Sequence, residues 1–212
     1  MKVIAVLNQK GGAGKTTIAT HLARALQIGG AEVLLVDSDP QGSARDWSAV
    51  REDQPVPVVG IDRPTIDRDL KSIVRKGFVV IDGAPQAHAL AVSAIKAANL
   101  VLIPVQPSPY DIWATSDLVE LVKQRQELTD GALQAVFVVS RAIKGTRIGA
   151  EATEALAGYD LPVLDARITQ RVIYPGSAAA GTTVLDQDPG SDAAQEVRAL
   201  TAAVLQYMGE GT

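Results

Sequence analysis

Cysteine is absent from the 212 residues, and histidine occurs only at His21 and His88. The absence of cysteine excludes disulfide bonds, thiolate zinc sites, iron–sulfur clusters and cysteine nucleophiles. Two histidines also provide little material for a histidine metal site. Aromatic residues make up only 4% of the chain, so we expect a core of alanine, valine, leucine and isoleucine.

Long apolar runs and an excess of basic residues are missing as well. The longest runs, such as Leu100–Val105, are far shorter than the ~20 residues that a membrane helix needs. The first residues, MKVIAVL, lead into a glycine-rich stretch without the layout of a signal peptide, so we expect a cytoplasmic protein. The net charge of −4 does not indicate nucleic-acid binding, although it leaves room for a local basic face.

Strand-like and helix-like segments alternate along the first two thirds of the chain. Unbroken apolar segments predict strands that are covered on both faces. These segments are Val3–Leu7, Val33–Val36, Phe78–Ile81, Leu100–Val105 and Ala135–Val139. The predicted helices between them are Thr16–Gly29, Ser43–Arg51, Thr65–Lys76, Ala87–Ala98 and Asp111–Leu128. The alternation predicts an α/β fold with a doubly wound, mainly parallel sheet flanked by helices.

The last third of the chain is less regular. Gly149–Ala157 and Ser191–Met208 predict helices, and Leu161–Val163 predicts a short strand. Tyr174–Gly190 is rich in glycine, alanine, threonine and proline and predicts a loop or short helical turns. The sequence contains no internal repeat, low-complexity tract or linker, so we expect a single domain over residues 1–212.

The strongest motif is Lys-Gly-Gly-Ala-Gly-Lys-Thr-Thr at residues 10–17, between the first predicted strand and helix. Gln9 replaces the first glycine of the ordinary P-loop pattern, and a second lysine, Lys10, begins the loop instead. The glycines allow backbone N–H groups to surround phosphate oxygens at the positive end of a helix. Lys15 can then reach the β- and γ-phosphates, and the Thr16 hydroxyl can coordinate Mg²⁺.

Carboxylates follow two further predicted strands. Asp37 and Asp39 come after the second strand, and Asp82 follows the third. Because ligands of doubly wound sheets bind at the carboxyl ends of strands, we expect these side chains to lie beside the glycine-rich loop. Each aspartate taken alone would more often form a turn or a cap, but together with the loop they favour a nucleotide-bound Mg²⁺.

These motifs resemble the deviant Walker A group of P-loop ATPases, which contains ParA, MinD, the nitrogenase iron protein and the arsenical-pump ATPase. Asp37–Gly42 and the proline-rich Pro104–Pro109 resemble ParA partition ATPases in particular. Ile168–Arg171 and Gly181–Val184 extend the similarity over nearly the whole chain. The start at the first strand resembles the short ParA class that includes ParF.

The resemblance implies roles for individual residues. Lys10, Lys15 and Asp39 would be the catalytic set, with Lys10 reaching phosphates in the other subunit of an ATP-sandwich dimer and Asp39 near the attacking water. Thr16, Asp37 and Asp82 would hold Mg²⁺. The nucleotide would contact Gly11, Gly12, Ala13, Gly14, Lys15, Thr16, Thr17, Pro104, Pro107 and Arg141, of which the prolines and Arg141 would lie near adenine.

The implied function is a partition ATPase that uses ATP/ADP and Mg²⁺, forms a homodimer when ATP is bound and hydrolyses ATP slowly without its partner. That partner would be a small centromere-binding protein of the ParB or ParG kind, and the cargo a plasmid or chromosome. Nonspecific DNA would be bound through basic residues, which would make the protein nucleoid-associated. The candidates are Arg141, Lys144, Arg147, Arg167 and Arg171.

Alternative functions remain open at this point. A MinD-like or other positioning ATPase would share the site, but the tail Arg198–Thr212 has one arginine and no lysine, which argues against membrane targeting. A P-loop ATP-dependent biosynthetic enzyme would need a substrate pocket beside the γ-phosphate, for which the sequence offers no evident residues. A nucleotide-gated binding module without turnover is a third class.

Overall fold

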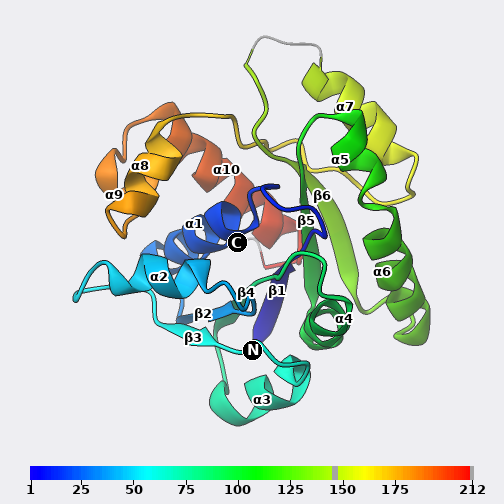
Figure 1. Ribbon diagram of the computed structural model, residues 1–212, viewed down its shortest axis with the longest axis horizontal. Helices are drawn as coiled ribbons and strands as arrows, with labels where there is room; N and C mark the ends of the chain where they lie inside the picture. The colour runs from blue at the N-terminus through cyan, green and yellow to red at the C-terminus, as the bar shows by residue number, and fades with distance from the viewer. Residues whose placement is uncertain (145–147, 211–212) are drawn as a thin grey trace.

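The computed structural model describes residues 1–144 and 148–210, and a parallel sheet of six strands forms its centre (Figure 1). The strand order is β3-β2-β4-β1-β5-β6, and every pairing is parallel. The strands are β1 (Lys2–Val6), β2 (Val33–Asp37), β3 (Val58–Gly60), β4 (Phe78–Asp82), β5 (Leu100–Val105) and β6 (Gln134–Val139). The predicted doubly wound parallel α/β fold is therefore confirmed.

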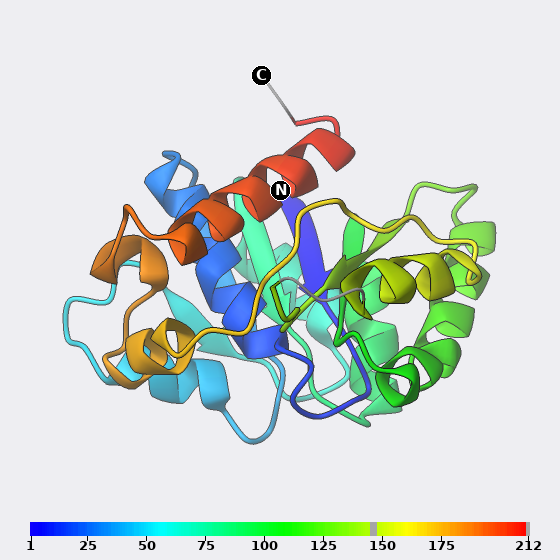
Figure 2. The same cartoon turned by 90° about the horizontal axis from the view of Figure 1, so that it is seen from above.

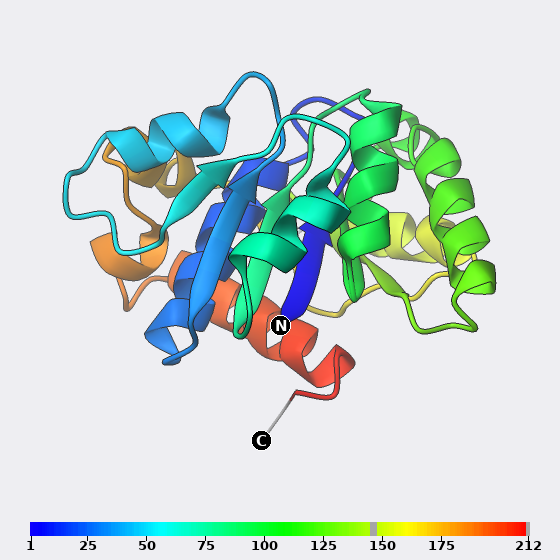
Figure 3. The same ribbon diagram turned by 90° about the horizontal axis from the view of Figure 1, so that it is seen from below.

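Helices cover both faces of the sheet, as Figures 2 and 3 show from opposite sides. One face packs against α1 (Lys15–Ile28), α2 (Ser43–Ala49), α8 (Ile173–Ala179), α9 (Val184–Gln187) and α10 (Asp192–Tyr207). The other packs against α3 (Ile66–Ile73), α4 (His88–Ala97), α5 (Pro109–Trp113), α6 (Ser116–Leu128) and α7 (Ile148–Ala157). The two cores consist almost entirely of aliphatic side chains, as the composition predicts. None of the described helices is long and apolar enough to cross a membrane.

The structure corrects three sequence-based predictions. Strand β3 was not predicted: it is three residues long, lies at the sheet edge and follows Pro55 and Pro57, which weaken a strand signal. The predicted strand Leu161–Val163 makes only a single bridge, between Val163 and Phe137. The predicted helix Asp111–Leu128 is divided into α5 and α6, and Thr115 at the break donates a hydrogen bond to the Ile112 carbonyl.

The register of the central strands determines where the functional side chains lie. β1 runs between β4 and β5, so the loop that follows it emerges in the middle of the carboxyl-end edge. Asp82, the last residue of β4, is the register partner of Val6 on one side and of Asp37 on the other. The glycine-rich loop and the two strand-end aspartates therefore share one edge of the sheet.

Candidate nucleotide-binding site

The glycine-rich loop between β1 and α1 has the conformation that its glycines allow. Gly12 and Gly14 have φ values of 78° and 89°, a region that other residues seldom adopt. Helix α1 begins at Lys15, directly after Gly14, so the amino end of a helix of 14 residues opens onto the loop. This arrangement presents backbone N–H groups and a helix terminus to an anion.

Side chains that come just after β1, β5 and β6 hold this loop in place. Asn8 donates a hydrogen bond to the Pro104 carbonyl at 2.7 Å and accepts one from the Lys10 backbone N–H at 2.8 Å. The Ser140 hydroxyl donates to the Ala13 carbonyl at 2.7 Å, and the Gln106 amide donates to the Gly12 carbonyl at 2.9 Å. Our sequence analysis did not identify these supporting contacts. The feature of the sequence that could have indicated them is a polar residue just after each of these apolar strands.

The two lysines of the loop lie in different surroundings. Lys15 is buried, and its ammonium group donates a hydrogen bond to the Lys10 carbonyl at 3.0 Å. Burial lowers the pKa of Lys15, while the carboxylates of Asp82 and Asp39 act in the opposite direction. Lys10 is exposed. Lys15 is thus folded into its own loop, whereas Lys10 is accessible from outside.

The two strand-end aspartates are both buried but differ in their partners. Asp37 accepts backbone hydrogen bonds from Asp39 at 3.0 Å and from Arg45 at 2.9 Å. Neither carboxylate oxygen of Asp82 has a hydrogen-bond partner of normal geometry among the described residues, although the Thr16 side chain interacts with this carboxylate. Burial raises the pKa of Asp82 to about 7, with a further contribution from Asp37, while Thr16 and Lys15 act against this rise. A buried carboxylate whose oxygens lack hydrogen bonds of normal geometry is well suited to coordinate a cation that prefers oxygen ligands, such as Mg²⁺.

The remaining residues expected at the site lie at the same edge of the sheet. Thr16 and Thr17 occupy the first turn of α1 and are partly exposed. Asp39 follows β2 in a turn, where its carboxylate accepts the Gln41 backbone N–H at 2.9 Å. Pro104 and Pro107 lie at the end of β5 and just after it, and Arg141 follows β6 with a φ of 51°. The residues predicted to contact phosphate and metal, and those for which the resemblance implies adenine contacts, thus lie at one edge of the sheet.

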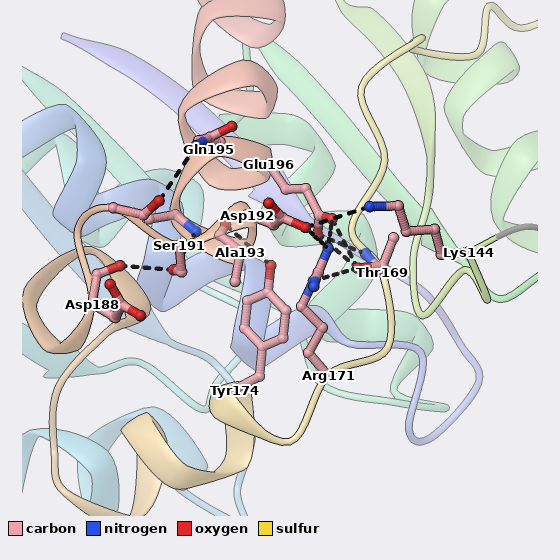
Figure 4. Close-up of polar contacts among 12 residues, drawn as sticks. Lys144, Thr169, Arg171, Tyr174, Asp188, Ser191, Asp192, Ala193, Gln195 and Glu196 are labelled. Carbon is pink, nitrogen blue, oxygen red and sulfur yellow. Dashed lines mark hydrogen bonds and ion pairs between the residues drawn. The ribbon is translucent and has the colours of Figure 1, made fainter.

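The predicted basic group is partly neutralised (Figure 4). Arg171 forms ion pairs with Glu196 at 2.7 Å and Asp192 at 3.2 Å, and Lys144 pairs with Asp192 at 3.4 Å. Both acidic residues belong to α10. Arg167 contacts the Thr153 hydroxyl, and Arg141 is exposed; Arg147 lies outside the described residues.

A glycine-rich loop between the first strand and helix, with carboxylates at the ends of two adjacent strands, is the arrangement of P-loop nucleotide-binding proteins. Comparison with known proteins narrows this class. The family described as CobQ/CobB/MinD/ParA nucleotide binding domain matches residues 4–184, and the chain belongs to this family. It is thus a member of the ParA/MinD group of partition and positioning ATPases.

Two curated relatives extend over nearly the whole chain. Maintenance of carboxysome distribution protein A from Halothiobacillus neapolitanus is 31% identical over 208 residues, covering 95% of each chain. The chromosome-partitioning ATPase Soj from Thermus thermophilus is 28% identical over 240 aligned positions, covering 98% of this chain and 96% of Soj.

Solved structures support the fold. A Cyanothece McdA–ATP complex superimposes with a TM-score of 0.76 at 17% identity, covering 100% of this chain and 98% of that one. Cobyrinic acid a,c-diamide synthase from Mycobacterium smegmatis with bound ADP and magnesium gives 0.77 at 23% identity, covering 100% and 96%. These two structural neighbours are complexes with ATP, or with ADP and magnesium. In the part of the chain that the structure describes, the Asp82 carboxylate beside the loop lacks a hydrogen bond of normal geometry, which is consistent with the use of nucleotide and magnesium.

Proposed function

We propose that this protein binds Mg²⁺ and ATP, dimerises in the ATP state, hydrolyses ATP slowly and positions a cargo along nonspecific DNA. The observation that carries the proposal is Asp82: among the described residues, no group lies in normal hydrogen-bond geometry to its buried carboxylate. Asp82 also adjoins Asp37 at the edge where the glycine-rich loop emerges. Burying a charge without a compensating partner costs folding free energy. A carboxylate in such a position therefore indicates a site where a bound ligand supplies the missing interaction.

The nucleotide phosphates would lie in the loop formed by Gly11, Gly12, Ala13 and Gly14. Lys15 and the backbone N–H groups at the start of α1 would hold them, with Thr17 near the α-phosphate. Thr16, Asp37 and Asp82 would hold Mg²⁺, directly or through water. When bound, Mg²⁺ neutralises charge on the β- and γ-phosphates. Pro104, Pro107 and Arg141 would lie near the base.

Hydrolysis would depend on Asp39, which would orient the attacking water next to the γ-phosphate. The sequence offers no evident arginine finger, so we expect slow turnover by the protein alone and acceleration by a partner. The partner we propose is a small cargo-bound protein of the ParB or ParG kind.

Dimerisation would follow from charge. Two ATP molecules that face each other across a two-fold interface repel, and the exposed Lys10 of each copy would neutralise the phosphates of the other. ATP would therefore favour the dimer and ADP the monomer. We further propose that residues 1–212 act as one unit in this cycle.

The cargo divides the proposal into two candidates. Plasmid or chromosome partition agrees with the resemblance to ParA proteins and with the relative named Soj. Positioning of a protein assembly is the second candidate, because the relative at 31% identity is named for carboxysome distribution. Both use the same nucleotide cycle, and affinity purification of the partner with ATP present separates them.

Light scattering after size exclusion tests the nucleotide cycle. The Asp39→Ala variant with saturating ATP and Mg²⁺ should elute as a dimer, and the same variant with ADP as a monomer. Adding Lys10→Ala should abolish the dimer, whereas Lys96→Ala, which removes an exposed lysine of α4, should not. A monomer in every sample would refute the proposal.

A further inference from the structure

Arg45 contacts Asp37, the last residue of β2, and Asp39 in the turn that follows. It lies in the first turn of α2, and its backbone N–H donates to one Asp37 carboxylate oxygen at 2.9 Å. Its Nε lies 3.5 Å from the same oxygen, and its Nη2 donates to the Asp39 carbonyl at 3.0 Å. One side chain therefore connects the strand-end carboxylate to the turn that carries Asp39.

The neighbouring backbone leaves room for this guanidinium group. A Cβ atom at Gly60 would lie 2.9 Å from Nη1 of Arg45, and one at Gly42 would lie 3.2 Å from Nε and Nη2. Gly42 also has a φ of 74°, which favours glycine. Two positions without side chains thus form a slot between the turn and β3 that accommodates the arginine.

The charge of Arg45 is directed at Asp37. The Asp37 side chain is fully buried, and the Nε atom of Arg45 is buried without a hydrogen-bond partner among the described residues. The nearest other carboxylate paired with Arg45 is Asp62, at 3.9 Å from Nη1. A cation at this distance from Asp37 opposes the arrival of a second cation at the same carboxylate.

We propose that Arg45 is a positioning residue with two separable effects. Its positive charge weakens the binding of Mg²⁺ at Asp37, and its hydrogen bond to the Asp39 carbonyl holds the turn that carries the Asp39 side chain. The proposal rests on the proposed function, since it assumes that Asp37 lies in the metal site. The result is a site that takes up Mg²⁺ readily only together with the phosphates of a nucleotide.

Two substitutions separate charge from geometry. Arg45→Gln removes the charge, so the Mg²⁺ concentration that half-saturates binding of a fluorescent ATP analogue should fall about three- to tenfold. Arg45→Lys keeps the charge, so the half-saturating Mg²⁺ concentration should stay within about twofold of wild type. The same variant loses the planar guanidinium group that reaches the Asp39 carbonyl. Both variants should hydrolyse ATP about three- to tenfold more slowly, because both lose the bond to the Asp39 carbonyl.

Matched controls keep the inference separate from the proposed function. Arg51→Gln removes a partly exposed arginine that pairs with Asp53. It should leave the half-saturating Mg²⁺ concentration and the rate of ATP hydrolysis unchanged. Arg45→Ala is a second variant that removes the positive charge. Thermal unfolding in EDTA checks that each variant is folded. If wild type and Arg51→Gln bind the analogue but Arg45→Gln and Arg45→Ala need as much Mg²⁺ as wild type, the inference is wrong. If wild type binds no analogue at any Mg²⁺ concentration, the proposed function itself fails.

Discussion

Asp37 and Asp82 are register partners at the carboxyl ends of adjacent strands, yet their carboxylates are stabilised very unequally. Asp37 accepts two backbone hydrogen bonds and lies beside Arg45, whereas Asp82 has no hydrogen-bond partner of normal geometry among the described residues. The fold thus holds one carboxylate in place and leaves its neighbour available. This inequality is the physical basis of the proposed metal site and leads to the first prediction.

Asp82→Asn should stabilise the protein in EDTA and weaken its use of Mg²⁺. The substitution replaces a buried unpaired carboxylate with a neutral amide, so the free energy of unfolding should rise by about 1–3 kcal/mol at pH 8. Chemical denaturation in EDTA measures this, and Asp165→Asn, at an exposed position, is the matched control. A variant that is less stable in EDTA, or that keeps wild-type Mg²⁺ dependence of nucleotide binding, would contradict the assigned role.

His21 should make the stability depend on pH in a mildly acidic range. Its buried ring contacts the Thr17 carbonyl through Nδ1 at 2.7 Å, and Nε2 accepts the Val184 backbone N–H at 3.1 Å. The neutral ring satisfies both contacts, and burial lowers the pKa of His21 to about 4.

The sign of this effect follows from the two pKa values. Between pH 4 and the unfolded value near 6.5, the unfolded chain binds the proton and the folded chain does not. Stability from this group is therefore present above pH 6.5 and decreases by about 3 kcal/mol as the pH falls to 4. His21→Gln should lose this part of the pH dependence, and His88→Gln, at an exposed position, should keep it. Parallel curves for wild type and His21→Gln would rule out this role.

Glu196→Gln should strengthen DNA binding if the basic group is the DNA-binding face. Glu196 forms an ion pair with Arg171 and accepts hydrogen bonds from Thr169, so it neutralises a cation that DNA phosphates would otherwise attract (Figure 4). Removing the charge should raise the affinity for DNA at low salt about three- to tenfold. The slope of log affinity against log salt concentration should steepen by up to about one released counterion per subunit.

Filter binding across a salt series, with ATP and the Asp39→Ala background, measures this effect. Glu154→Gln removes the same charge from an exposed position on α7 and should change little. Equal curves for the two glutamate variants would place the DNA contact elsewhere on the surface.

Sequence patterns predicted the central strands and the loop because both depend on local features. Unbroken apolar segments such as Leu100–Val105 can be buried only between two layers, and the spacing of glycines and lysines in residues 10–17 has a direct physical reason. Strand β3 was missed because a three-residue edge strand after two prolines has almost no periodic signal.

The supporting contacts could not be predicted because they join distant parts of the chain. Ser140 and Ala13 are 127 positions apart, and Asn8 and Pro104 are 96 apart. The pairing of Arg171 with Glu196 likewise depends on how α10 packs, because the two residues are 25 positions apart. The side chains of the site were predictable as a set, but their hydrogen bonds and ion pairs required the fold.

Calorimetric titration of the protein with ATP in the presence of Mg²⁺ tests the central claim most directly. The account predicts one nucleotide per chain for wild type and for Lys96→Ala. For Lys15→Ala it predicts at least about tenfold weaker binding, because this variant loses a charged hydrogen-bond donor to phosphate. Wild-type protein that takes up no nucleotide, or Lys15→Ala that binds it equally well, would contradict the account.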